Sequence, residues 1–590
     1  MRKIICTLVM AAMAMSLMAV PARRGWQTMT QPDGTTIRVE LRGDEFYHYW
    51  VDENGNQVEQ TDEGYWQVVG AAPTGSQVAA RMTAKRSARR SSVVPRMAGS
   101  SSALPTKLLV ILVNFSDKSM VSSHNNAFFT NMLNQNGFSP SGSVKDYFTA
   151  SSDGKYVPTF DVFGPVTLDK KMEYYGGNDS YGDDMHPCEM AYDACKKADA
   201  AGCNFANYDC NNDGTVDNVY IIYAGYGEAA GAPKNTIWPH SWDISGEGLS
   251  LRLDGKKISH YACSAELSGK SGTQSDGVGT FAHEFSHVIG LPDYYDTDYE
   301  TNYENGTTPN EWSLMDGGSY NNNGQSPPLY SIFDKYFMGW ATPKILKDPE
   351  NVTMTTASAD ARQITSSNSL VAYSNTGTVY YVENRSATNS FDKYLPGTGM
   401  VVWKVQYNST AWNNNNLNNT AGTLRYTIVP ADKKTRNFGQ STDAFPRGGT
   451  SVTPISGHEI TDVALNNEVI TFKYNGGIQK CTVTFNGNGK GTPASSSLTE
   501  ASSGSGVTMP NVTGVTSGYT FLGWATSSTA TTPDAGTAGQ TYRPSSDITL
   551  YAVYKREGYV NVEYNLEGIT KATGPAAGEF QKAGGFSATF

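Results

Sequence analysis

Two kinds of hydrophobic pattern occur in the middle of this chain. Residues 108–113 and 218–223 are short, almost continuously apolar runs, a pattern typical of strands buried on both faces of a sheet. Longer stretches have helical periodicity and predict helices at 143–150, 187–200, 278–289 and 329–340. Together these elements predict an α+β domain, with a mixed sheet and helices, over residues 106–345.

The flanking segments alternate polar and apolar residues in short runs between Asn and Gly turns, which predicts strands. Before the central domain, this pattern covers residues 23–80. After it, residues 346–475 predict a β-sandwich-like domain, and residues 479–556 predict a separate small β module. We expect residues 557–590 to begin a further β module whose pattern is incomplete.

A basic stretch separates the first β-rich segment from the central domain. Residues 81–96 contain six basic and no acidic residues, interleaved with Ser and Ala. We expect residues 81–105 to be a flexible, protease-accessible linker. Nucleic-acid binding is the alternative, but no aromatic residues are interleaved with the basic ones. The net charge of −11 also argues against a nucleic-acid partner.

Residues 1–22 predict a secretory signal peptide. Arg2 and Lys3 precede an apolar run over residues 4–20, and small residues suited to cleavage follow. A membrane anchor is the alternative, but Arg23 and Arg24 come directly afterwards and no second apolar span occurs. We therefore expect an exported protein, secreted or at the cell surface, without a transmembrane segment.

Export makes disulfides available to the six cysteines that follow the signal. Four of them fall between positions 188 and 210, and none has CxxC spacing. Structural disulfides or buried thiols are therefore favoured over a zinc cluster.

The sequence HEFSHVIGLPD at residues 283–293 carries the most specific chemical signal. Residues four apart share a helix face, so His283 and His287 can direct both imidazoles at one zinc ion. Glu284 can act as general base on water at that metal. The following glycine lets the chain turn back and offer Asp293 as a third ligand. A solvated helix face is the alternative, but the chain has only 8 His in 590 residues.

Two residues beyond this motif bear on the same site. Met315, in the sequence WSLMDGGS, could give the ligands an apolar, polarizable floor, although taken alone it would be a core residue. Asp296 is a second acidic residue within reach of the metal and leaves the third ligand open. A structural zinc site fits less well, because such sites close with Cys or a fourth protein ligand.

A second candidate metal site precedes the strand at 218–223. Asp209, Asn211, Asp213 and Asp217 stand at positions 1, 3, 5 and 9 of a loop with Gly at position 6, which predicts calcium binding. Position 12 is Tyr220 rather than the bidentate Glu of an EF-hand. An Asx-rich turn is the alternative.

The motifs HEFSHVIGLPDYYD and WSLMDGGS together resemble the M6 family of metalloproteases, the immune-inhibitor-A-like peptidases of the metzincin clan. The resemblance covers roughly residues 105–475. It implies a metzincin-like catalytic fold and zinc-dependent endopeptidase activity on proteins or peptides, with His283, His287 and Asp293 as ligands and Glu284 as base. Residues 481–555 resemble the Listeria–Bacteroides repeat, a small β-grasp-like module of bacterial surface proteins, which implies association with a cell surface.

The order of signal, β-rich segment and basic linker ahead of a hydrolase predicts a zymogen. Its prosegment, residues 23–80, contains no Cys that could block the zinc, so Asp44 or Glu45 is our candidate for that task. The competing hypothesis is a non-catalytic surface adhesin that binds through its repeat modules. A complete set of ligands with a base beside them favours the enzyme.

Overall fold

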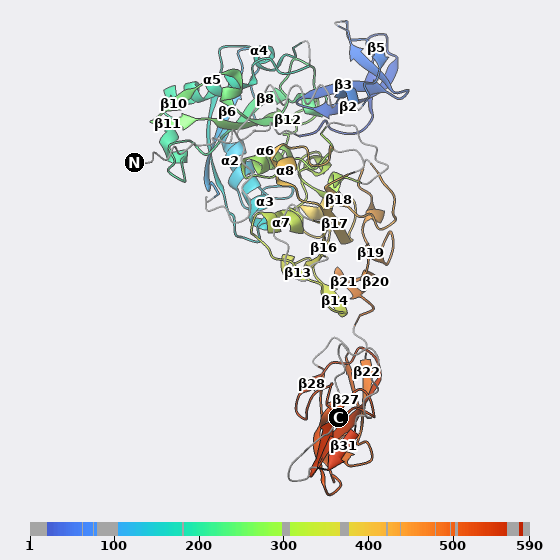
Figure 1. The fold of residues 1–590 in the computed structure, drawn as a ribbon. Coiled ribbons are helices and arrows are strands. Elements are labelled where there is room, and N and C mark those ends of the chain that lie inside the picture. The colour runs from blue at the N-terminus through green and yellow to red at the C-terminus, as the bar shows by residue number, and fades with distance from the viewer. Residues whose placement is uncertain are drawn as a thin grey trace, which may run out of the picture. The chain divides into compact units, whose positions relative to one another are not determined.

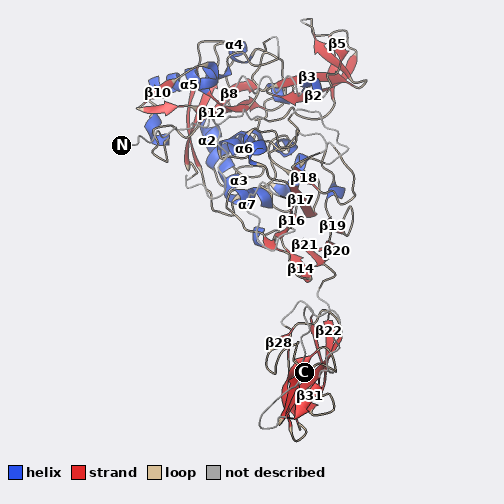
Figure 2. Cartoon of the chain, viewed as in Figure 1, coloured by secondary structure: helices blue, strands red, loops and turns tan. Residues whose placement is uncertain are grey.

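The computed structural model is a mixed α/β protein with many sheets and few helices (Figures 1 and 2). It describes residues 20–581 except 62, 75, 79–103, 180–181, 298–306, 366–376, 420–422, 437, 478–479, 496, 502–505 and 563–577. Most of the predicted signal peptide, nearly all of the basic linker and residues 582–590 lie outside the described residues.

Contacts divide the chain into two compact units. The first comprises the chain up to Ile345 with Thr353–Ile455 and Val463–Thr471, and the second comprises Leu346–Val352, Ser456–Asp462 and Phe472–Phe590. No helix among the described residues is both long and apolar enough to cross a lipid bilayer.

The segment before the basic linker is a five-stranded antiparallel meander in the order β1-β2-β3-β4-β5, which confirms the strands predicted for it. β3 buries Tyr47, Tyr49 and Val51 at alternate positions, as a strand with one covered face requires. The strands are β1 (Gln27–Thr30), β2 (Thr36–Asp44), β3 (Tyr47–Asp52), β4 (Asn56–Gln60) and β5 (Trp66–Ala71).

The central sheet has the strand order β7-β6-β8-β12-β9. Neighbouring strands are parallel except for the edge strand β9, which runs antiparallel to β12, so the sheet is mixed as predicted. Its strands are β6 (Lys107–Asn114), β7 (Thr159–Thr167), β8 (Val219–Tyr226), β9 (His240–Asp243) and β12 (His260–Leu267). A hairpin of β10 (Leu251–Leu253) and β11 (Lys256–Ile258) precedes β12.

Helices cover both faces of this sheet (Figure 1). Side chains of β6 alternate between two cores, because successive residues of a strand point to opposite faces. Leu108, Val110 and Leu112 pack with α2 (Asn126–Asn134), α3 (Val144–Ser151) and α6 (Val278–Val288). Leu109, Ile111 and Val113 pack with α4 (Met172–Gly176) and α5 (Pro187–Ala200).

Three of the four predicted helices match closely, and the fourth is shorter. α7 spans Ile332–Phe337 instead of residues 329–340. A capping box between Ser331 and Asp334 fixes its start, and Gly339 follows its end with a φ of +74°.

The β-rich region after the central domain contains two sheets. Residues on both sides of position 345 share one hydrophobic core, which joins Trp312 and Phe333 to Trp403 and Tyr426. The first sheet contains β13 (Lys344–Ile345), β15 (Arg362–Ile364), β16 (Val379–Arg385), β17 (Gly399–Val405) and β18 (Tyr426–Ile428), with α8 (Ser409–Asn413) after β17. The second contains β14 (Glu350–Met354), β21 (Val469–Tyr474), β20 (His458–Asn466) and β19 (Val452–Ile455).

The C-terminal β module has a small core of its own around Phe485, Trp524 and Leu550. Its main sheet has the order β24-β22-β29-β27, formed by β22 (Lys480–Asn486), β24 (Ser497–Ala501), β27 (Tyr519–Ala525) and β29 (Ile548–Arg556). Three short pairs accompany it: β23 (Thr492–Pro493) with β26 (Val512–Thr513), β25 (Val507–Thr508) with β28 (Thr541–Tyr542), and β30 (Tyr559–Val562) with β31 (Gly578–Gln581).

Candidate metal centre

Helix α6 places His283 and His287 one turn apart, with ring centroids separated by 4.7 Å. Both side chains are fully buried. Their Nδ1 atoms lie 2.8 Å from the carbonyl oxygen of Leu314 and 2.7 Å from that of Leu291, respectively. A carbonyl only accepts hydrogen bonds, so each Nδ1 donates and each Nε2 retains its lone pair.

The chain turns back directly after α6, where Gly290 has the predicted positive φ, at +110°. This turn brings Asp293 Oδ1 to 3.0 Å from His283 Nε2 and 3.4 Å from His287 Nε2. The two Nε2 atoms are 3.1 Å apart. Among the described residues, these three form the one group of His, Cys, Asp and Glu side chains that could hold a metal ion, and Asp296 is not part of it.

The electrostatics of the group fit a bound cation. Burial lowers the pKa of His287, and the negative charge of Asp293 only partly opposes this. Burial would raise the pKa of Asp293, but the charges and hydrogen bonds of the two histidines outweigh it and lower that pKa. Two nitrogen lone pairs and a carboxylate therefore converge on one point, and a metal ion satisfies all three.

Asn415 holds Asp293 in place. Its side-chain oxygen accepts a hydrogen bond from the Asp293 main-chain nitrogen at 2.7 Å, and its Nδ2 donates to Asp293 Oδ2 at 2.6 Å. This residue lies in the turns after α8, 122 positions away, and is almost completely buried. Sequence analysis missed it, because one asparagine in an Asn-rich stretch carries no motif.

The turn that carries Met315 packs directly against α6. The carbonyl of Leu314 orients His283, and the carbonyl of Met315 accepts a hydrogen bond from the Tyr294 nitrogen at 2.8 Å. Met315 itself is fully buried. The turn therefore connects both ends of the ligand set, whereas the role of the Met315 side chain stays a prediction.

Glu284 lies on the same helix and is also fully buried. Its Oε1 accepts a hydrogen bond from the main-chain nitrogen of Val20 at 2.8 Å. Its Oε2 has no hydrogen-bond partner among the described residues. Burial raises the pKa of Glu284 well above its ordinary value, and the charge of Asp293 raises it further.

The segment that reaches Glu284 comes from the extreme N-terminal part of the described chain. Val20 and Ala22 are buried in a small apolar cluster with Trp238 and Ala229. The Trp238 Nε1 donates to the carbonyl oxygen of Val20 at 3.0 Å. The hydroxyl of Tyr320 donates to the carbonyl oxygen of Pro21 at 2.8 Å. Main-chain atoms of this segment therefore form hydrogen bonds with the candidate base, Glu284, and with Trp238 and Tyr320.

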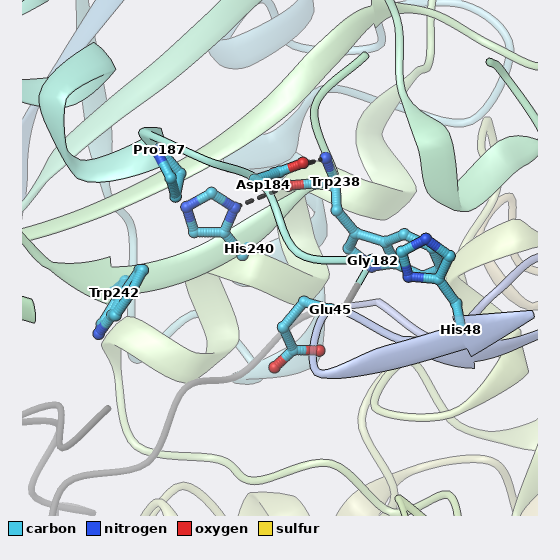
Figure 3. Close-up of a pocket in the computed structure, with 8 residues that line it drawn as sticks. All are labelled: Glu45, His48, Gly182, Asp184, Pro187, Trp238, His240 and Trp242. Atoms are coloured by element: carbon cyan, nitrogen blue, oxygen red, sulfur yellow. Dashed lines mark hydrogen bonds between the residues drawn. The ribbon is translucent and has the colours of Figure 1, made fainter. Parts of the chain in front are cut away.

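The β-rich segment docks nearby through His48, whose ring stacks on Trp238 with centroids 4.5 Å apart (Figure 3). His48 Nε2 lies 3.0 Å from Glu228 Oε1. Glu45 lines the adjoining small cavity, and Asp44 accepts hydrogen bonds from the Phe46 and Tyr47 nitrogens within its own turn. The hydrogen bond to Glu284 comes from Val20, and the zinc-blocking role expected for Asp44 or Glu45 stays a prediction.

The acidic loop predicted to bind calcium is closed by its own hydrogen bonds. Asp209 Oδ1 and Oδ2 accept from the Asp213 and Gly214 nitrogens at 3.0 Å, and Lys256 Nζ lies 2.7 Å from Oδ2. The hydrogen bond from Lys256 is the main reason why the pKa of Asp209 lies below its ordinary value. The carboxylate of Asp217 accepts from the Cys210 nitrogen at 2.8 Å.

The side chains of Asn211 and Asp213 also accept hydrogen bonds from the main chain of this loop. Asn211 and Asp213 accept from main-chain nitrogens two residues further on, at 2.9 Å each, as in Asx turns. The observed hydrogen bonds are those of an Asx-rich turn. Calcium binding by this loop stays a prediction.

The six described cysteines are free thiols, and five of them are buried. Cys195 and Cys263 are completely buried, and burial raises the pKa of both. This outcome corresponds to the buried-thiol alternative of the sequence analysis.

The region that contains these residues is similar to a known family. Residues 97–341 match the family described as Immune inhibitor A peptidase M6, catalytic domain, and residues 482–553 match the Listeria–Bacteroides repeat domain. Immune inhibitor A of Bacillus thuringiensis subsp. alesti is 30% identical over 218 residues, which are 33% of this chain and 31% of that protein.

Two further relatives are more distant. The pre-pro-metalloprotease PrtV of Vibrio cholerae is 27% identical over 220 residues, 33% of this chain and 23% of PrtV. A protein of Arthroderma benhamiae described as a secreted metallopeptidase is 25% identical over 254 residues, 37% of each chain. The match thus spans less than two fifths of each relative. Within those limits, residues 97–341 match the catalytic domain of the immune inhibitor A (M6) peptidases, and residues 482–553 match a Listeria–Bacteroides repeat domain.

Proposed function

We propose that this chain is an exported zinc endopeptidase that hydrolyses peptide bonds within proteins, with Glu284 as general base. The convergence of His283, His287 and Asp293 beside a buried glutamate carries this proposal. Two imidazole nitrogens and one carboxylate form a ligand set that zinc uses in catalytic sites, which keep one position open. When bound there, zinc supplies Lewis acidity toward water and a substrate carbonyl.

Glu284 takes the proton of the attacking water and passes it to the leaving nitrogen. Its raised pKa suits this exchange, because a carboxylate with an ordinary pKa releases protons readily but accepts them poorly near neutral pH. Its Oε2, which lacks a hydrogen-bond partner among the described residues, is the oxygen we assign to this task.

Tyr320 is our candidate for binding the carbonyl of the substrate. Burial raises the pKa of its hydroxyl well above the ordinary value, so the group stays a hydrogen-bond donor. It already donates to a main-chain carbonyl, that of Pro21, one residue from the contact with Glu284. Tyr320 lies five residues after Met315, and this spacing alone does not assign it to the role.

The described arrangement corresponds to a latent form in our account. Val20 and Pro21 occupy the hydrogen-bonding positions at Glu284 and Tyr320, so a substrate cannot use them until this segment leaves. This latent form requires a signal boundary before Val20 instead of the boundary expected after residue 22, because Val20 itself contacts Glu284. N-terminal sequencing of the latent protein distinguishes the two boundaries.

The repeat domain supports a second, separate role in attachment to a cell surface. It has its own core around Trp524 and shares none of the candidate catalytic residues. The competing adhesin hypothesis assigns this role to the whole protein, but it gives no function to a buried base beside a three-ligand group.

The test is Glu284→Gln, measured after limited proteolysis in the basic linker has released the prosegment. We expect the metal to stay bound and cleavage of protein substrates to fall roughly a hundred- to ten-thousandfold, because the base is lost and the ligands remain. The exposed Glu459→Gln is the matched control and should cleave as the unmodified protein does. Retained cleavage in Glu284→Gln would refute the assignment of the base.

A further inference from the structure

Arg24 binds a second acidic pocket, separate from the candidate metal ligands. Its Nη2 lies 2.9 Å from Asp316 Oδ1, and its Nη1 donates to Asn310 Oδ1. The Asp316 side chain is completely buried, and that of Arg24 is 18% exposed. One terminal nitrogen of the guanidinium thus contacts a carboxylate and the other contacts an amide oxygen, an arrangement that suits the planar guanidinium of arginine.

The pocket contains a second carboxylate, that of Glu311. Burial raises the pKa of Glu311, and the positive charge of Arg24 opposes this, so the two groups interact across the pocket. Glu311 also accepts a hydrogen bond from the Gly439 nitrogen. The pocket therefore contains two acidic side chains and one cation from the N-terminal segment.

The turn holds this pocket in shape independently of Arg24. Asp316 Oδ2 accepts from the Asn310 nitrogen at 2.7 Å, and its Oδ1 accepts from the Gly317 nitrogen at 2.8 Å. These bonds fix the carboxylate in the turn that follows Met315. A preorganised carboxylate of this kind loses little freedom when it binds a cation.

The same short segment contacts both the candidate base and the acidic pocket. Val20 contacts Glu284 and Arg24 contacts Asp316, so the two contacting residues are four positions apart in the chain. When the segment leaves the base, it also removes the guanidinium from the pocket. A buried carboxylate without its cation is costly, so the emptied pocket should favour a new cationic group.

We propose that Asn310, Glu311 and Asp316 form a substrate subsite for an arginine or lysine side chain, about four residues from the residue held at Glu284. This inference rests on the proposed peptidase function, and Arg24 is the ligand that marks the subsite in the latent form. Arginine should bind better than lysine, because only a guanidinium can contact Asp316 and Asn310 through separate nitrogens.

The test compares peptide substrates that differ only by arginine or norleucine at one position, scanned over the residues on either side of the cleaved bond. The protein is the full chain, activated by limited proteolysis in the linker. At one position we expect kcat/KM for the arginine peptide to exceed that for its norleucine partner about tenfold or more. The ratio of the two kcat/KM values is determined separately for each protein, so a general loss of activity in a variant cancels.

Two variants assign this ratio to the pocket. We expect Asp316→Asn and Glu311→Gln each to lower it severalfold, and Glu311→Gln keeps an oxygen that can accept from the Gly439 nitrogen if Asp316→Asn does not fold. Asn323→Ala is the matched control: Asn323 contacts the neighbouring Arg23 at an exposed position, so this change should leave the ratio unaltered. Equal rates for both peptides at every position, or an unchanged ratio in both pocket variants, would overturn the proposal.

A binding measurement separates this inference from the proposed function. A synthetic peptide of residues 20–30 should compete for the activated Glu284→Gln protein about tenfold better than its Arg24→Gln counterpart. Equal affinity of the two peptides would also overturn the subsite. Absence of cleavage in the unmodified protein, together with a tenfold difference in binding, would refute the peptidase and leave the cation pocket standing.

Discussion

The candidate metal centre at α6 and the acidic loop before β8 both contain metal-ligating residue types at suggestive spacings, yet the lone pairs of these residues have different partners. At His283 and His287, hydrogen bonds to Leu314 and Leu291 engage Nδ1 and leave Nε2 free to bind. In the loop, the carboxylate of Asp209 already accepts from two main-chain nitrogens and from Lys256.

The spacing of ligand residues therefore does not by itself determine whether a site binds a metal. The surrounding hydrogen bonds decide whether the ligand atoms remain available. In the metal centre they point the lone pairs at one another, whereas in the loop they use those lone pairs to close a turn. The predictions below change one side of this comparison at a time.

Removal of the metal should have the largest effect. We expect a chelator to abolish cleavage by the activated protein and to lower its Tm, since a metal at a hundredfold excess over its Kd stabilises the folded state by about 2.7 kcal/mol. Zinc should restore both properties, and calcium should restore neither. Activity that survives complete chelation would contradict the role of the α6 centre. Thermal unfolding and a protein-cleavage assay measure the two effects.

Loss of the residue that orients Asp293 should have the next largest effect. Asn415→Ala removes both hydrogen bonds to Asp293, and we expect zinc affinity to fall about 10–100-fold. Asn419→Ala is the matched control, because Asn419 accepts from Thr297 and not from Asp293. Competition with a chromophoric chelator measures both affinities. Equal affinities of the two variants would show that Asn415 does not position the ligand.

A smaller effect is expected at the acidic loop. If the loop is only an Asx-rich turn, unmodified protein should show no change in Tm with millimolar calcium, because Lys256 occupies the carboxylate of Asp209. Lys256→Gln frees that carboxylate, and we expect a calcium-dependent rise in Tm with a Kd on the order of 1 mM. The exposed neighbour Lys257→Gln is the control. A calcium-dependent rise in the unmodified protein would show that the loop binds calcium and that the sequence pattern was correct.

A pH-dependent effect is expected at Asp334, a buried carboxylate whose hydrogen bonds come from no basic residue. Burial raises the pKa of Asp334 to about 6, although Tyr294 and Ser331 hydrogen-bond to it. The folded state then holds the proton more tightly than the unfolded chain, so stability should fall as pH rises from about 4 to about 6, by at most about 1.4 kcal/mol per pH unit. Asp334→Asn should flatten this slope, and the exposed Asp348→Asn should not. Identical slopes from denaturant unfolding would contradict the raised pKa.

Elements with a strong local pattern could be predicted from the sequence. β6, β8 and α6 are buried almost throughout, so their composition reports their environment directly. The approach of His283 to His287 follows from helical spacing, and the turn after the helix follows from Gly290, which adopts a positive φ. α7 was predicted too long, because the capping box at Ser331 and the positive φ of Gly339 limit it more than its apolar content suggests.

The missing parts of the site depend on contacts between distant residues. Asn415 and Val20 approach the centre from 122 and 264 positions away, and neither has a local motif. Lys256 lies outside the acidic loop, so the pattern that predicted calcium could not include it. Sequence spacing indicates which atoms can bind a metal, but only the fold determines what else they contact.

Metal content per chain shows whether Asp293 is a zinc ligand and whether Asp209 is not. We predict one zinc per chain in the unmodified protein and in Asp209→Ala, and none in Asp293→Ala, as measured by elemental analysis of the purified full-length proteins. Zinc retained by Asp293→Ala, or lost from Asp209→Ala, would contradict this account.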